Sequence, residues 1–147
     1  MKCDNYVKLS IPAMSRNESY ARAAVGAFVS QLDPTLDELG SVKAAVSEAV
    51  TNCVVHAYAE SKTVGIINIT VRITGNNVYI KITDKGCGIE DIKKAMEPLF
   101  TTKPELERSG LGFAVMESCC DKVKVSSKVG KGTTVSLTFR FEEKVLE

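Results

Sequence analysis

The stretch Val78-Tyr-Ile-Lys-Ile-Thr-Asp-Lys-Gly-Cys-Gly88 decides how this chain folds, because it joins a half-buried strand to an unusual turn. Apolar and polar residues alternate up to Thr83, which is the period of a β-strand with one buried face. Asp84 follows at the strand end, and Gly86 and Gly88 permit close approaches that side chains would prevent. Alone, Asp-x-Gly-x-Gly is more often an ordinary turn, so its meaning depends on the rest of the chain.

A long amphipathic helix precedes this strand. Thr35-Leu-Asp-Glu38 has the form of a capping box, and apolar residues recur at helical spacing from there to about Ala57. Glu48, Asn52 and His56 follow each other at intervals of four, so they share one side of this helix, next to its apolar stripe. Such a polar stripe is by default a solvated helix face.

Further patterns predict the remaining elements. We expect a strand over 6–11, a helix from the capping box Ser15-Arg-Asn-Glu18 to about Gln31, a hairpin over 67–82 turning at 75–77, a short helix from Gly112, and a hairpin over 122–141 turning at 130–132. Strands at both ends with helices between them predict one α+β domain over residues 1–147. Its architecture would be a two-layer sandwich, with a mixed, mostly antiparallel sheet and helices on one face.

Composition disfavours a role that depends on a strongly basic protein. Nineteen Lys and Arg against 18 Asp and Glu leave a formal net charge of +1, so no overall field attracts nucleic acid or an anionic membrane. No signal-peptide or membrane-spanning run occurs, which predicts a cytoplasmic protein. The five cysteines form no Cys-x-x-Cys pair and accompany one histidine, so they are interpreted as reduced structural thiols.

Two more glycine motifs occur near predicted element ends. Gly110-x-Gly112 precedes a helix whose free N–H groups can hold phosphate oxygens, although a flexible loop entering a helix has the same pattern. Gly132-Thr-Thr134 begins a strand where a hydroxyl can help fix a base, although a plain hairpin turn also explains it. The stretch 89–112 is expected to be irregular, and it is too long for an idle connector in so small a domain, so it is either functional or disordered.

Taken in order, Glu48-x-x-x-Asn52, Asp84-x-Gly-x-Gly88, Gly110-x-Gly112 and Gly132-Thr-Thr134 resemble the four boxes of the GHKL ATPase superfamily of gyrases, chaperones, histidine kinases and mismatch-repair proteins. Within it, the segments 31–38, 47–52 and 98–113 look like those of the anti-sigma serine kinases of sporulation. The resemblance extends from about Asn17 to Thr134.

The resemblance implies a Bergerat-type ATP-binding fold that uses ATP or ADP with Mg²⁺. Asp84 would accept a hydrogen bond from the adenine amino group and Thr133 would support the base. Gly86 and Gly88 would shape that pocket. Asn52 would bind Mg²⁺.

On the phosphate side, Glu48 would be the catalytic base. The lid would span about 90–112, and Arg108 would reach the γ-phosphate when the lid closes. Ser109, Gly110, Leu111 and Gly112 would also bind nucleotide. A solvated loop charge explains Arg108 equally well, and Lys103 has a weaker claim to a role.

The resemblance also implies partners. The protein would be a homodimer that binds and inhibits a sigma factor and phosphorylates a serine of an anti-anti-sigma protein, with no direct contact to nucleic acid or membrane. Arg22 would face a partner, although a plain surface arginine is an equal alternative. Two other functions stay open: a nucleotide-gated binding module without kinase activity, and the related kinase that controls a general-stress sigma factor.

Overall fold

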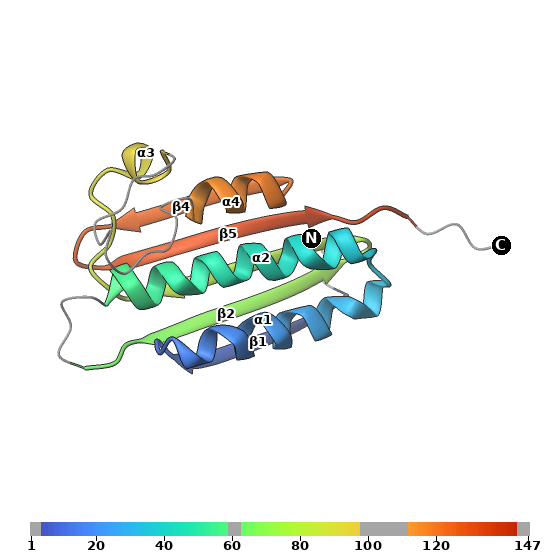
Figure 1. The fold of residues 1–147 in the computed structure, drawn as a ribbon, viewed down its shortest axis with the longest axis horizontal. Helices are drawn as coiled ribbons and strands as arrows, with labels where there is room; N and C mark the ends of the chain where they lie inside the picture. Colours follow the sequence, from blue (N-terminus) through green and yellow to red (C-terminus); the bar gives the residue numbers. More distant parts are fainter. Residues whose placement is uncertain (1–3, 59–62, 98–111, 144–147) are drawn as a thin grey trace.

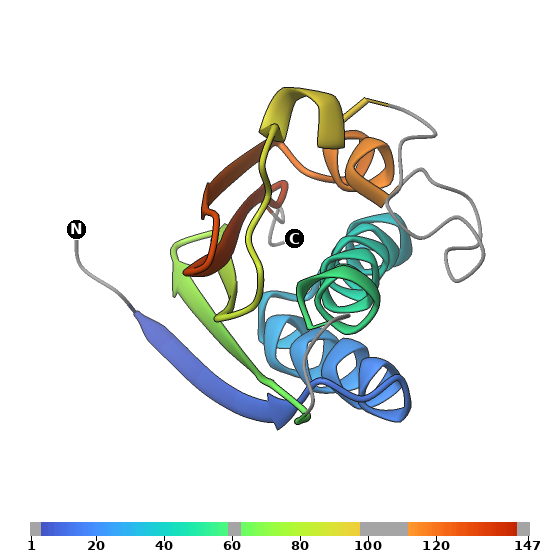
Figure 2. The same ribbon diagram turned by 90° about the vertical axis from the view of Figure 1, so that its left-hand side faces the viewer.

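The computed structural model, which describes residues 4–58, 63–97 and 112–143, has two layers: a five-stranded sheet and a layer of helices across one of its faces (Figure 1; Figure 2). The strands are β1 (Asn5–Pro12), β2 (Ile66–Thr74), β3 (Asn77–Asp84), β4 (Lys122–Lys128) and β5 (Gly132–Arg140). The helices are α1 (Arg16–Val29), α2 (Leu36–Asn52), α3 (Ile92–Ala95) and α4 (Gly112–Cys119), with a 3₁₀ turn over Ser30–Leu32 and a π-helical turn, η2, over Cys53–Ala57. The predicted α+β two-layer sandwich is confirmed.

The sheet brings distant parts of the sequence together. Its order is β1-β2-β3-β5-β4, and each of its described pairings is antiparallel. The β2–β3 and β4–β5 hairpins are those predicted, and β3 joins β5 between them. In that pairing Asp84 lies directly opposite Thr133. Two residues that the sequence separates by almost fifty positions therefore meet at one end of the sheet.

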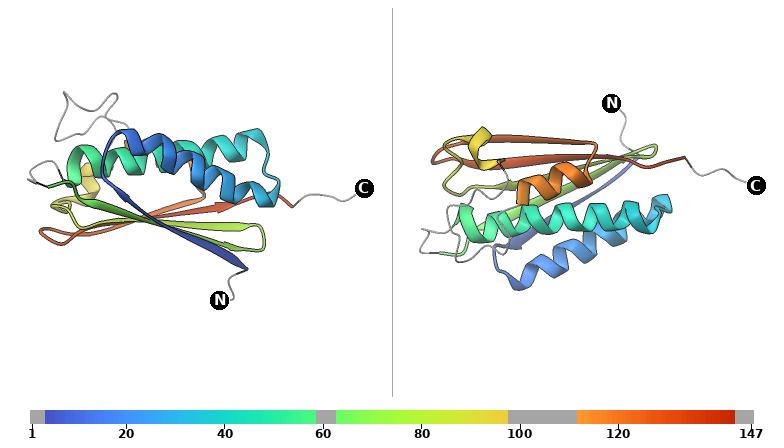
Figure 3. Two further views of the ribbon diagram at one scale, coloured as in Figure 1. Left: turned by 90° about the horizontal axis from the view of Figure 1, so that it is seen from below. Right: turned by 45° about the horizontal axis from the view of Figure 1, so that its top comes forward.

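Helices α1, α2 and α4 lie side by side on the sheet (Figure 3). Alternate residues of β2, β3 and β5 point toward them and are almost completely buried, as the period of two predicts. The largest fully buried side chains include Ile67, Ile69, Ile80, Ile82 and Leu137 of the sheet, Val42, Val46 and Val50 of α2, and Met116 of α4. Helix α2 contacts α1, α4 and β5, so it lies at the centre of the helical layer.

Helix α2 begins as predicted and ends differently. Thr35 Oγ1 accepts a bond from Glu38 N at 3.0 Å, and Glu38 Oε1 accepts one from Thr35 N at 2.9 Å, which is a complete capping box. We expected one helix through Ala57, but after Asn52 the backbone widens into η2. A π turn contains more residues than an α turn, so His56 does not continue the helical spacing of Glu48 and Asn52.

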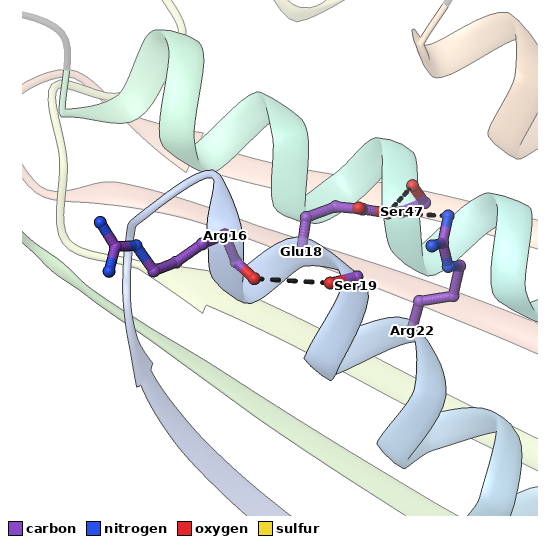
Figure 4. Close-up of polar contacts among 5 residues, drawn as sticks. All are labelled: Arg16, Glu18, Ser19, Arg22 and Ser47. Carbon is purple, nitrogen blue, oxygen red and sulfur yellow. Dashed lines mark hydrogen bonds and ion pairs between the residues drawn. The ribbon is translucent and has the colours of Figure 1, made fainter.

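The start of α1 corrects a prediction. Ser15 has helical dihedrals and its side chain makes no capping bond, so the predicted box with Glu18 is wrong. The Glu18 carboxylate turns instead toward α2, where it accepts a hydrogen bond from Ser47 Oγ, and it pairs with Arg22 at 3.3 Å (Figure 4). Glu18 therefore ties α1 to α2. The helix itself ends at Val29, two residues before the predicted end.

Part of the stretch expected to be irregular is ordered. Residues 92–95 form the short helix α3, which Asp91 caps by accepting a bond from Lys94 N at 3.1 Å. Short polar side chains before a helix are frequent caps, but four helical residues are too few to give a periodic pattern.

The face of the sheet away from the helices is basic. It carries Lys8, Arg72, Lys81, Lys122, Lys124, Lys128 and Arg140, and the only carboxylate within the five described strands, Asp84, points toward the helices. Helices α1, α2 and α4 carry the carboxylates Glu18, Asp37, Glu38, Glu48 and Glu117 against Arg16, Arg22 and Lys43. With Lys93 and Lys94 of α3 counted, the helices hold equal numbers of carboxylates and basic residues, so the excess positive charge of the described elements lies on the sheet. Within the described residues, no helix is long and apolar enough to cross a membrane.

Candidate functional site

A cavity of about 900 Å³ opens where the end of α2, the loop after β3, α3, the start of α4 and the β4–β5 hairpin meet. Of the residues predicted for the site, Asn52, Asp84, Gly88, Gly112 and Thr133 line it. So do residues 89–95 and His56, while Glu48 and Gly86 are not among the lining residues. All five of these segments, which the sequence separates, thus contribute to one cavity between the two layers.

Asp84 is held rigidly in one wall of the cavity. Its side chain is only 6% exposed. Oδ1 accepts bonds from Gly86 N at 2.9 Å and Thr133 N at 3.2 Å, and Oδ2 accepts a weaker one from Cys53 Sγ at 3.6 Å. Burial raises the pKa of Asp84, although the bonds from Gly86, Cys53 and Thr133 act in the opposite direction. The result is a fixed hydrogen-bond acceptor at the bottom of the site.

Cys53 is a contact that sequence reasoning missed. Its spacing places it on the apolar stripe of the helix, and it is indeed buried at 4% exposure, but its thiol also faces Asp84. Burial and the neighbouring Asp84 carboxylate raise the pKa of the Cys53 thiol. The thiol therefore stays protonated and acts as a donor. No sequence signal distinguishes this cysteine from an ordinary core residue.

The glycines of the Asp-x-Gly-x-Gly turn are required by contacts within the protein. A Cβ on Gly86 would lie 2.1 Å from Ala57 O, and one on Gly88 would lie 2.4 Å from Lys128 O, where φ is also +80°. Cys87 between them donates its N–H to Ala57 O at 2.8 Å and accepts from Gly130 N at 2.8 Å. The loop is therefore clamped between η2 and the β4–β5 turn, and it shapes the cavity by holding these segments together.

Glu48 and Asn52 converge on the start of α4. A Cβ on Gly112 would lie 3.3 Å from Glu48 Oε2 and 3.3 Å from Asn52 Oδ1. Both side chains therefore reach the same point, where the first turn of α4 faces α2. The absence of a side chain at Gly112 leaves room for the carboxylate and the amide beside each other.

Asn52 has an unused polar atom. Its Nδ2 is buried and has no hydrogen-bond partner among the described residues. An unsatisfied buried donor costs about 1–3 kcal/mol, so the amide is suited to a ligand in the cavity. Amide oxygens are ligands of Mg²⁺, which keeps few protein ligands and shares the rest among phosphates and water. The described residues hold no cluster of three His, Cys, Asp or Glu, so any metal here would depend on such shared coordination.

Several predicted site residues lie elsewhere. Arg108, Ser109, Gly110 and Leu111 fall outside the described residues, as does Lys103 with most of the predicted lid. Arg22 does not line the cavity: it lies on α1, where its side chain is 45% exposed and pairs with Glu18 (Figure 4).

The two-layer fold, the fixed acceptor in a cavity and the Glu/Asn pair at a helix start together define a nucleotide-binding domain of the ATPase type. A family model described as "Histidine kinase-like ATPase domain" matches residues 11–139. Anti-sigma F factors are close relatives: that of Anoxybacillus flavithermus is 55% identical over 133 residues, 90% of each chain. That of Geobacillus stearothermophilus is 53% identical over 140 residues, 95% of each chain. The chain therefore belongs to the histidine kinase-like ATPase family and, within it, to the anti-sigma F factors.

Solved structures agree on the fold. The chain matches part of the crystal structure of the RsbU and RsbW domains of Rv1364c from Mycobacterium tuberculosis with a TM-score of 0.68 and 20% identity, over 93% of this chain and 32% of that one. It also matches the histidine kinase domain of a blue-light activated kinase from Erythrobacter litoralis with a TM-score of 0.56 and 17% identity, over 89% and 62%. At these identities the likeness concerns the fold alone.

Proposed function

We propose that this protein is an anti-sigma factor and an ATP- and Mg²⁺-dependent protein serine kinase that inactivates its own antagonist. The names of its relatives support the first half, since the chain covers nine-tenths or more of each relative cited above. The second half is carried by one observation: Glu48 and Asn52 meet at Gly112, beside the cavity that Asp84 and Thr133 also line.

The base would bind at the sheet end of the cavity. The fixed Asp84 carboxylate would accept a hydrogen bond from the exocyclic amino group of adenine, and Thr133 would support the ring. Because Asp84 is held by three donors, its orientation would not depend on the ligand. Preorganised acceptors of this kind bind without the cost of reorganisation.

The phosphates would lie toward the helices. Asn52 would hold Mg²⁺, which when bound supplies positive charge against the phosphate oxygens. The N–H groups at the start of α4 would add donors, and Arg108, Ser109, Gly110 and Leu111 are assigned to the same end by the family resemblance. The span from Asp84 to Gly112 would thus hold one nucleotide across the seam between the layers.

Glu48 would act as general base. It would orient a seryl hydroxyl of the partner and accept its proton while the seryl oxygen bonds to the γ-phosphorus. The bond from that phosphorus to the oxygen bridging the β-phosphate would break, and ADP would leave. Positioning and electrostatics supply most of the acceleration in such a transfer, so a carboxylate fixed against α4 suits the task.

The partners would be a sigma factor and an anti-anti-sigma protein that carries the substrate serine, and the kinase itself would be a homodimer. Arg22 would contact a partner from α1, after exchanging Glu18 for an acidic group of that partner. Replacing Arg22 with Ala should weaken sigma binding in a pull-down, and unchanged binding would remove Arg22 from the interface.

The decisive experiment is transfer of labelled γ-phosphate from ATP, with Mg²⁺, to a candidate anti-anti-sigma protein. Glu48→Gln should lower the transfer rate by about 10²–10⁴-fold while ATP binding persists. Glu117→Gln, which alters an exposed carboxylate on α4, is the matched control and should be neutral. Binding of ATP without transfer by the wild-type protein would contradict kinase activity and favour a nucleotide-gated binding module.

A further inference from the structure

Ser127 of β4 lies at the sheet end of the cavity and connects three segments. Its Oγ accepts a bond from Ile89 N at 2.7 Å, donates to Gly132 O at 3.0 Å, and lies 2.8 Å from Thr133 Oγ1. These partners belong to the loop after β3 and to the start of β5. Ser127 also lines the cavity beside Thr133.

The protons of this cluster can be assigned by counting donors and acceptors. A serine hydroxyl has one proton and two lone pairs. The Ile89 N–H can only donate and the Gly132 carbonyl can only accept. The contact between Ser127 Oγ and Thr133 Oγ1 fits either donor; with the Ser127 proton on the Gly132 carbonyl, Thr133 donates its own proton to the remaining lone pair of Ser127.

These hydrogen-bond directions determine whether the Thr133 hydroxyl can donate to a ligand or only accept from it. Its proton is used inside the protein, so its oxygen presents only lone pairs to the cavity. Asp84, directly opposite Thr133 in the sheet, is also an acceptor when ionised. The wall that would hold the base is therefore built of acceptors, which suit an exocyclic amino group and disfavour a carbonyl oxygen at the same place.

We propose that Ser127 is a positioning residue for base selection: its hydroxyl fixes Thr133 as an acceptor, and so helps the site prefer a 6-amino purine to a 6-oxo purine. This inference rests on the proposed nucleotide binding at Asp84. Ser127 also links the position of the base to the cavity wall formed by residues 89–95, because the same Ser127 Oγ accepts the hydrogen bond from Ile89 N.

The test is calorimetric titration of the full chain with MgATP and MgITP, whose bases differ at the 6-position. Ser127→Ala frees the Thr133 proton and removes the partner of Ile89 N. Since a hydrogen bond is worth a factor of about five to ten in binding, the ATP affinity should fall by that factor, with ITP affinity changed less than about twofold. Ser127→Thr keeps the hydroxyl and should restore the preference.

Ser126→Ala is the matched control, because Ser126 is the neighbouring residue on the opposite, exposed face of β4 and should alter neither affinity. An equal loss of ATP and ITP binding in Ser127→Ala would assign Ser127 a purely structural role and overturn the inference, as would an unchanged preference. A wild-type protein that binds both nucleotides equally, or neither, would instead overturn base recognition at Asp84.

Discussion

Replacing Gly86 with Ala should destabilise the fold and weaken nucleotide binding together. The added Cβ would lie 2.1 Å from Ala57 O, whereas real Cβ contacts begin at 3.0 Å, so loop and helix end must separate by about 0.9 Å. Such overpacking against backbone costs about 1–3 kcal/mol. The same movement lengthens the 2.8 Å bond from Cys87 N to Ala57 O beyond bonding range, which costs about 0.5–1.5 kcal/mol more.

The expected loss in the free energy of unfolding is therefore about 2–4 kcal/mol, measured by urea unfolding of wild type and variant. ATP affinity should fall as well, because Gly86 N also holds Asp84 at 2.9 Å. Gly40→Ala is the matched control: Gly40 is exposed in α2 with no atom near its added Cβ, so it should stabilise the protein by about 0.5–1 kcal/mol. An unfolding midpoint for Gly86→Ala equal to that of wild type would refute the clamp around this loop.

Three other measurements test separate features. Thr35→Ala removes the capping box with Glu38 and should lower the free energy of unfolding by about 1 kcal/mol, without changing ATP affinity. Burial raises the pKa of Asp84 in the folded protein above its ordinary value of 3.8. The contribution of the protonated Asp84 to the free energy of unfolding is therefore fully present below pH 3.8, and it is lost as the pH rises through the raised pKa. Between about pH 3 and pH 7, the free energy of unfolding of Asp84→Asn, measured with urea, should therefore fall less than that of wild type, and parallel pH curves for the two proteins would contradict the raised pKa. The variant should also bind ATP more weakly. Iodoacetamide should modify exposed Cys87 before buried Cys53, and this modification should reduce ATP affinity. Peptide mapping identifies the modified cysteine. If Cys87 is modified and ATP affinity is unaltered, the Cys87 thiol is not part of the site.

The sequence predicted the elements whose patterns are strong and local. The alternation in β2 and β3 and the box at Thr35 each depend on a few neighbouring residues, and both are found where expected. Glu18 shows the limit of such reasoning. Its spacing from Ser15 satisfies the capping rule, yet the carboxylate bonds to Ser47 of another helix, which only tertiary structure determines.

The candidate site was predictable as a set of motifs and not as a set of contacts. The motifs indicated Asp84 and Asn52, and both line the cavity. The contacts of Cys53 and Ser127 depend on packing between elements, although the register of the β4–β5 hairpin, once its turn is placed, sets Ser127 opposite Thr133. The π turn after Asn52 leaves no mark in the spacing of apolar residues, because it lasts a single turn.

The basic outer face of the sheet has a consequence for how this molecule meets charged partners. Seven basic side chains on the outer face of the sheet, against five carboxylates and five basic residues on helices α1 to α4, concentrate the positive charge of the described elements on one side along the normal to the sheet. A charged protein that comes within about 8 Å at physiological ionic strength experiences a torque as well as a force. Encounters with an anionic surface should therefore be oriented before contact, with that surface turned toward the sheet. Association rates should fall with added salt even though the net charge is only +1.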